Sequence, residues 1–243
     1  HVKSEPGVDW GLNTDVKNPV VILAAGASSR MKSVEGVSEA IAKEVTSRPK
    51  AMLRVGDGEV PFLELLLKRI KKEGSNCVIV VIGEKDHITE KYFSSNHIEG
   101  LEIRYVVQTI PQDRNKPLGT ADAVERALLS NTDLSNHSIV VCNGDNMPPE
   151  ESFSEIFKFN CAMLAYDSSK LGLPEDRVSV FAVADIDSEG YLKQIIEKPP
   201  KETLPNFIQS DGTLRVSMNM FKMSFSDFII SVKDCPLDDV RNE

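Results

Sequence analysis

The feature that most constrains the fold is the alternation of short apolar runs with amphipathic stripes between residues 20 and 157. Such runs are typical of buried strands, and stripes with a helical period are typical of helices. The expected strands cover residues 20–24, 77–82, 101–107 and 138–142, and the expected helices cover 61–73, 87–94, 119–129 and 150–157. Strands that alternate with helices pair in parallel, so we predict an α/β fold with a three-layer, doubly wound sheet.

The pattern changes after residue 159, where strand-like runs follow one another with few helical stripes between them. They span residues 161–166, 178–185, 191–197 and 214–223, and turn chemistry at 187–190 joins two of them as a hairpin. The sheet is therefore expected to be mixed. Residues 1–18 are polar and aperiodic and are assigned to an N-terminal arm, and residues 19–243 to one domain. Residues 33–47 predict an inserted helix of undecided role, and residues 51–55 a short strand.

Composition excludes several classes of function. The net charge is −9 and no lysine or arginine block offsets it, so nucleic acid is a poor partner. The apolar runs are too short to cross a bilayer, and no leader pattern precedes them, so we expect no membrane association. The four cysteines lack CxxC spacing, which indicates reduced thiols and a cytoplasmic location. Whether the chain forms a homo-oligomer is left open.

The first expected strand ends in small residues that suit a ligand. Leu23, Ala24, Ala25 and Gly26 bring little bulk to the carboxyl end of this strand, so a nucleotide can approach the backbone amides. Arg30 adds a charge that can grip phosphate oxygens. The competing interpretation is an ordinary tight turn with a solvated arginine, and the loop alone does not decide between them.

Several further motifs follow this loop in a fixed order. They are Pro49-Lys50, residues 117–121, Gly144-Asp145, residues 197–199 and residues 217–221. Together with the loop they resemble the sugar-1-phosphate nucleotidyltransferase family, the pyrophosphorylases that make nucleotide sugars, over about residues 19–221. The resemblance implies a Rossmann-like nucleotide-diphospho-sugar transferase fold. It also implies an enzyme that joins a nucleoside triphosphate to a sugar-1-phosphate and releases pyrophosphate.

The reaction explains the catalytic residues that the resemblance implies. A phosphate oxygen of the acceptor attacks the α-phosphorus in line, so catalysis is mostly positioning and charge neutralisation. Arg30 and Lys50 would hold the triphosphate, and Asp145 would bind Mg²⁺, which prefers oxygen ligands. The competing interpretation of Asp145 is a turn aspartate, because residues 143–146 are also good turn sequence.

The same resemblance implies the nucleotide-binding residues. Leu23, Ala24, Ala25 and Gly26 would border the base and the phosphates. Gln108 ends an expected strand and would read the base edge through its amide, although the long stretch 109–116 makes Gln112 a rival. Gly119 and Thr120 would begin a helix whose amide end faces the nucleotide.

The sugar-phosphate side is also implied by the resemblance, with one departure. Glu197 would accept sugar hydroxyls, Lys198 would meet the phosphate, and Asn219 would bond a further hydroxyl. The competing interpretation of the first two is a charged strand end before a proline pair. Where the family often has a tyrosine-glycine pair, this chain has Val178-Ser179. The acceptor side is therefore expected to be narrower, and the acceptor to differ from an ordinary hexose phosphate.

The metal site of the family is only partly matched. The family commonly supplies a second aspartate or asparagine on a strand well after Asn219, but Asp227, Asp238 and Asp239 lack a strand context. The sequence therefore leaves open a truncation at the C-terminus or an incomplete metal site. The segment between Gly26 and Lys50 is also longer than is usual in the family.

Two alternatives remain. A cytidylyltransferase acting on a small phosphorylated alcohol or a cofactor would share residues 23–31, but residues 119–121 and 197–199 favour a sugar. A non-catalytic sensor of nucleotide sugars would be expected to lose at least one of Arg30, Lys50 and Asp145, and all three are present.

Overall fold

A computed structural model describes residues 15–26, 48–56, 60–114, 116–172, 175–233 and 235–237, with the side chains of residues 175 and 176 left out. The predicted helix at 33–47, the phosphate ligand Arg30 and most of the predicted arm lie outside the described residues. Residues 15–18 are bonded to the body: Asn76 Oδ1 accepts from Lys17 N at 2.7 Å, and Asn76 Nδ2 donates to the Asp15 carbonyl.

A mixed sheet of eight strands organises the described part of the chain, with strand order β3-β2-β1-β4-β8-β6-β7 and β5 paired to β8. The parallel strands are β1 (Val20–Leu23), β2 (Cys77–Gly83), β3 (Glu102–Gln108) and β4 (Ser138–Asn143). The antiparallel section consists of β5 (Ala162–Asp167), β6 (Ala182–Ile186), β7 (Leu192–Ile196) and β8 (Arg215–Ser224). The predicted mixed, doubly wound sheet is confirmed.

Helices cover both faces of the parallel strands because side chains alternate along each strand. On β1, Val20 and Ile22 join a core cluster with α2 (Phe62–Lys72), α3 (Thr89–Ser95) and α5 (Ser152–Ile156). Val21 joins the opposite cluster with α4 (Thr120–Leu129) and α7 (Phe225–Lys233). The side chains of Val20, Val21 and Ile22 are all fully buried. Among the described residues as a whole, no helix has the length and apolar content that a bilayer crossing needs.

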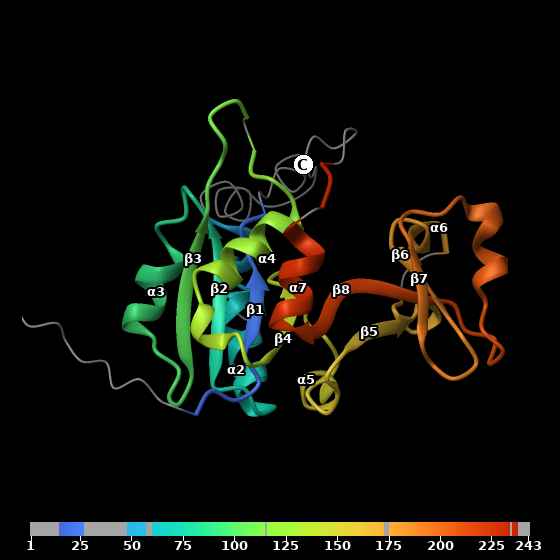
Figure 1. Ribbon diagram of the computed structural model, residues 1–243, viewed down its shortest axis with the longest axis horizontal. Helices are drawn as coiled ribbons and strands as arrows, with labels where there is room; N and C mark the ends of the chain where they lie inside the picture. The colour runs from blue at the N-terminus through green and yellow to red at the C-terminus, as the bar shows by residue number, and fades with distance from the viewer. Residues whose placement is uncertain are drawn as a thin grey trace, which may run out of the picture.

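A second lobe is built on the antiparallel strands (Figure 1). It contains β6, β7, α6 (Glu175–Val178) and the 3₁₀ segment Lys201–Phe207, and β5 and β8 connect it to the body. Its small core is formed by Val178, Val183 and Val216. The pairing of β5 with β8 shifts register between Met163 and Ala165, where β8 passes from the body into the lobe.

Two local predictions were wrong, and one helix was not predicted. Residues 51–55 were expected as a strand, but Lys50–Met52 is a 3₁₀ helix, and Arg54 forms an isolated β-bridge with Pro61. The strand predicted from residue 178 begins at Ala182, because Val178 ends α6. Helix α7 was not expected. Its start is marked by Ser224, whose Oγ accepts from Asp227 N at 3.1 Å, a capping signal that the sequence does contain.

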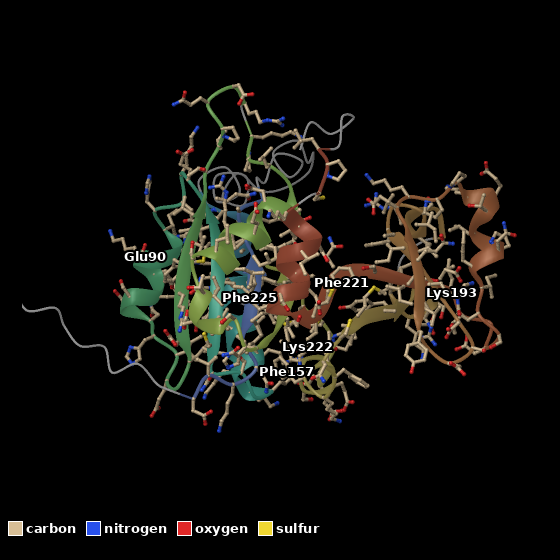
Figure 2. All side chains as sticks on the ribbon, viewed as in Figure 1. Glu90, Phe157, Lys193, Phe221, Lys222 and Phe225 are labelled. Atoms are coloured by element: carbon tan, nitrogen blue, oxygen red, sulfur yellow. The ribbon has the colours of Figure 1, made fainter. Side chains whose placement is uncertain are left out.

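Helix α5 is held at both ends by side chains from distant elements. Glu73, after α2, accepts backbone N–H bonds from Glu151, Phe153 and Ser154 at 2.8–3.2 Å. At the other end, the buried Lys222 of β8 donates to the Phe157 carbonyl at 2.8 Å, and Figure 2 shows the two residues together. Burial lowers the pKa of Lys222. These contacts fix the segment that follows Asp145.

We predict that Glu73→Ala lowers the free energy of unfolding by about 1–3 kcal/mol, because partly buried N–H groups lose their acceptor. Urea denaturation followed by circular dichroism measures this change. The exposed Glu99 offers a matched control, and Glu99→Ala should leave stability unchanged. Equal stabilities of the two variants would contradict the role of Glu73.

Candidate active site

The order of the parallel strands places a crevice beside β1. The chain runs outward from β1 to β2 and β3, and then returns to β4 on the other side of β1. In an open α/β sheet, ligands bind outside the carboxyl ends of the strands at such a switch point. The residues that follow β1 and β4 are the small-residue loop and Gly144-Asp145, so the topology brings these two motifs together.

A cleft with a volume of about 1040 Å³ lies at this position. It is lined by seven segments of the described chain: the loop after β1, the 3₁₀ segment at Lys50, the end of β3, the start of α4, the loop after β4, the end of β7 and the end of α7. The predicted site residues among its lining are Leu23, Ala24, Ala25, Gly26, Lys50, Gln108, Gly119, Thr120, Asp145, Glu197 and Lys198. The cleft thus gathers residues that are far apart in the sequence.

Lys50 and Asp145 form an ion pair in the cleft. The Lys50 Nζ lies 2.5 Å from Asp145 Oδ2, and the two side chains are 42% and 38% exposed. Because both groups are this exposed, the pair contributes little to stability and can open when a ligand arrives. The carboxylate that was predicted to bind the metal is thus paired with the lysine that was predicted to hold the triphosphate.

Two glycines shape the cleft in different ways. A Cβ added at Gly26 would have no atom of the described residues within 4 Å. A Cβ at Gly144 would lie 3.1 Å from both Ala24 Cβ and Ile22 Cγ2. The missing side chain of Gly144 therefore lets the loop after β4 pack closely against β1, which brings Asp145 to the small-residue loop.

Gln108 is buried at the end of β3, and its amide is already bonded. Its Nε2 donates to the carbonyls of Leu118 and Gly119 at 2.7 and 3.1 Å, and to Asp122 Oδ2 at 2.8 Å. The amide therefore ties the end of β3 to the start of α4. Gly119 is the residue before α4 and Thr120 is its first residue, and both line the cleft.

The residues predicted for the sugar phosphate are only partly brought together. Glu197 and Lys198 line the cleft at the end of β7, and Lys198 has a left-handed φ of 46°. Asn219 is not among the described residues that line the cleft. It is exposed within β8, where its φ of 59° accompanies the irregular pairing of this strand with β5. Strained backbone of this kind is concentrated at functional sites and at bends.

Several lining residues were not predicted from the sequence. Asp122 lies in the first turn of α4, Lys116 precedes that helix, and Lys233 ends α7. Together with Lys50 and Lys198, these lysines give an acidic protein a local set of cations. The capping pattern at Ser224 would have revealed α7, but nothing local in the sequence shows that its far end returns to the cleft.

The four cysteines differ in their exposure, and one of them lines the cleft. Cys235 is exposed and lines the cleft, Cys161 is exposed outside its lining, and Cys77 and Cys142 are buried. Burial raises the pKa of the thiols of Cys77 and Cys142 to about 12. At neutral pH the two buried thiols are therefore protonated and shielded, and they should be unreactive.

We predict that N-ethylmaleimide modifies Cys161 and Cys235 in the native protein and leaves Cys77 and Cys142 intact. A nucleoside triphosphate should slow the labelling of Cys235 about fivefold or more by occupying the cleft, without changing Cys161. Peptide mass spectrometry over a time course measures both rates. Equal protection of both thiols, or of neither, would contradict ligand binding in this cleft.

The sequence and the structure of this chain are similar to those of known nucleotidyltransferases. Residues 19–221 match the family described as Nucleotidyl transferase. The bifunctional protein GlmU of Methanococcus maripaludis is 29% identical over 201 residues, covering 83% of this chain and 40% of the relative, so this chain spans less than half of that protein. D-glycero-alpha-D-manno-heptose 1-phosphate guanylyltransferase of Campylobacter jejuni is 24% identical, with 90% of each chain covered. The crystal structure of HddC from Yersinia pseudotuberculosis superposes with a TM-score of 0.58 at 20% identity, over 88% of this chain and 79% of HddC.

Proposed function

Because the chain belongs to the nucleotidyl transferase family, we propose that it joins a nucleoside triphosphate to a sugar-1-phosphate and releases pyrophosphate. The observation that carries this proposal is the Lys50–Asp145 pair at the switch point of the sheet, in a cleft that is also lined by residues 23–26, the start of α4 and Glu197-Lys198. Relatives whose names specify a substrate act on sugar phosphates: heptose 1-phosphate in Campylobacter and glucose-1-phosphate in Mycobacteroides abscessus.

The residues in the cleft suit a divalent metal such as Mg²⁺. No group of three or more histidine, cysteine or acidic side chains arranged to hold a metal occurs in the described part of the chain. Mg²⁺ does not need one, because it commonly binds through one or two carboxylates, substrate phosphates and water. Asp145 provides such a carboxylate with an exposed, cation-paired oxygen. When bound, Mg²⁺ would neutralise phosphate charge and help to align the triphosphate.

The side chains of this protein would position the two reactants. Lys50 would leave Asp145 for the phosphates of the nucleotide, and Arg30 would add a second cation. The amides at the start of α4 would face the nucleotide. Lys198 and Glu197 would hold the phosphate and hydroxyls of the acceptor from the side of the second lobe. The acceptor oxygen would then reach the α-phosphorus in line with the departing pyrophosphate, with no protein nucleophile involved.

Pyrophosphate release tests the activity directly. The protein is incubated with each nucleoside triphosphate, Mg²⁺ and a panel of sugar phosphates and phosphorylated alcohols. Release with a sugar-1-phosphate supports the proposal, and release only with a phosphorylated alcohol would replace it by a cytidylyltransferase-type activity. Binding of nucleotide sugars without release under any condition would favour a sensor.

We predict that Asp145→Asn lowers turnover by about two orders of magnitude or more, because the metal loses an anionic ligand. Pyrophosphate release measures this loss, and circular dichroism checks the fold. The control is Glu189→Gln, an exposed residue in the turn before β7, which should keep full activity. Unchanged turnover in Asp145→Asn would remove Asp145 from the metal role.

A further inference from the structure

We propose that the cleft selects guanine as the base of its nucleoside triphosphate, with Asp122 and the Oε1 atom of Gln108 as the groups that read it. The inference rests on the proposed function, since it names the substrate class of that same site. It follows from the hydrogen bonds that connect the end of β3 to the first turn of α4.

Gln108 can offer a ligand only an acceptor. Its Nε2 lies within 3.1 Å of three oxygens, the carbonyls of Leu118 and Gly119 and the carboxylate of Asp122. An amide nitrogen has two hydrogens, so its donors are used up within the protein. The reverse orientation of the amide would place Oε1 against three acceptors and is excluded by repulsion. The atom left for a base is therefore Oε1.

Asp122 adds an oriented carboxylate beside this acceptor. Arg126 Nε contacts both of its oxygens, at 2.8 and 3.0 Å, and Gln108 Nε2 contacts Oδ2 at 2.8 Å. The side chain is 14% exposed, and the residue lines the cleft. A carboxylate has about four lone-pair sites, and these three contacts do not fill them. The partners therefore fix the direction of the carboxylate while leaving acceptor capacity for a ligand.

The two groups lie where a base would be expected. Gln108 ends β3, and Asp145 follows β4, three strand positions away in the sheet order. At about 4.8 Å per strand, the two sites are roughly 14 Å apart along the edge of the sheet. Phosphates held at Lys50 and Asp145 would therefore leave the far end of the nucleotide near β3 and α4.

An edge composed of acceptors discriminates between bases. Guanine presents two adjacent donors, N1–H and the N2 amino group, which can meet a carboxylate side by side. Adenine and cytosine each present one amino group beside a ring acceptor, and uracil and thymine present one N–H between two carbonyls. Against a carboxylate and an amide oxygen, each of these bases leaves an acceptor facing an acceptor, which costs affinity.

Binding of nucleotides to the unmodified protein tests the proposal without requiring turnover. Isothermal titration with Mg²⁺ compares GTP with ATP, UTP, CTP, TTP and ITP, whose hypoxanthine base lacks only the N2 amino group of guanine. We expect GTP to bind about 10- to 100-fold more tightly than ATP and the pyrimidine nucleotides, and about tenfold more tightly than ITP. Equal binding of GTP and ITP would overturn the role of the carboxylate.

The variant Asp122→Asn locates the effect, because it replaces a charged acceptor by an amide of the same shape. The advantage of GTP over ITP should fall to about twofold or less in this variant. Glu125→Gln, on the same helix and also lining the cleft, should keep that advantage. An unchanged advantage in Asp122→Asn would contradict the proposal.

The choice of guanine and the proposed enzymatic activity can fail independently of each other. Tight binding of another nucleotide, with pyrophosphate released from it, would leave the enzyme intact and overturn only the choice of guanine. Selective GTP binding with no pyrophosphate release from any sugar phosphate would support the base assignment and contradict the activity.

Discussion

The pairing of β1 with parallel strands on both of its edges is the constraint on which the rest of the structure depends. With β2 on one side and β4 on the other, β1 is buried at both edges, and Val20, Val21 and Ile22 are buried on both faces. The loops after β1 and β4 must then leave the sheet at the same edge. Because Gly144 has no side chain, these loops can approach within contact distance. Asp145, the next residue, therefore lies beside the small-residue loop.

The proposed function requires a chain with a net charge of −9 to hold polyphosphates. The charge that matters is local: Lys50, Lys116, Lys198 and Lys233 line one cleft. Lys50 Nζ pairs with Asp145 Oδ2 at 2.5 Å in this cleft. Under the proposed function, a metal–nucleotide complex would bring a cation for the carboxylate and anions for the lysine. The pair could then exchange partners without leaving either charge uncompensated.

Much of the fold was predictable because its signals are local. Buried parallel strands such as residues 77–82 are continuous apolar runs, and α2 carries a regular apolar stripe, so both were predicted to within a residue or two. The predicted fold and the family resemblance are confirmed. Residues 51–55 were mistaken for a strand because a short apolar run does not distinguish a strand from a buried helical turn, and Ala51 and Met52 are buried in a 3₁₀ helix. Asn219 was predicted in the site, but the bend in β8 places it outside the described cleft lining.

Residues of the candidate site that belong to sequence motifs could be identified from the sequence. Residues that reach the cleft through tertiary contacts could not. Lys50 and Asp145 were assigned from their motifs, and the structure brings them into contact across 95 residues of sequence. The commitment of the Gln108 donors to Leu118, Gly119 and Asp122 depends on how β3 meets α4, and no local pattern reveals it. The same limit applies to Lys233, which reaches the cleft only because α7 packs on α4.

A crystal structure with Mn²⁺ and a non-hydrolysable nucleoside triphosphate tests the central claim most directly, because Mn²⁺ can be located by its anomalous scattering. The account predicts a Mn²⁺ ion about 2.2 Å from an Asp145 oxygen, bridging to the phosphates, with Lys50 Nζ moved onto a phosphate oxygen. A nucleotide bound elsewhere, with the Lys50–Asp145 pair still closed, would contradict it.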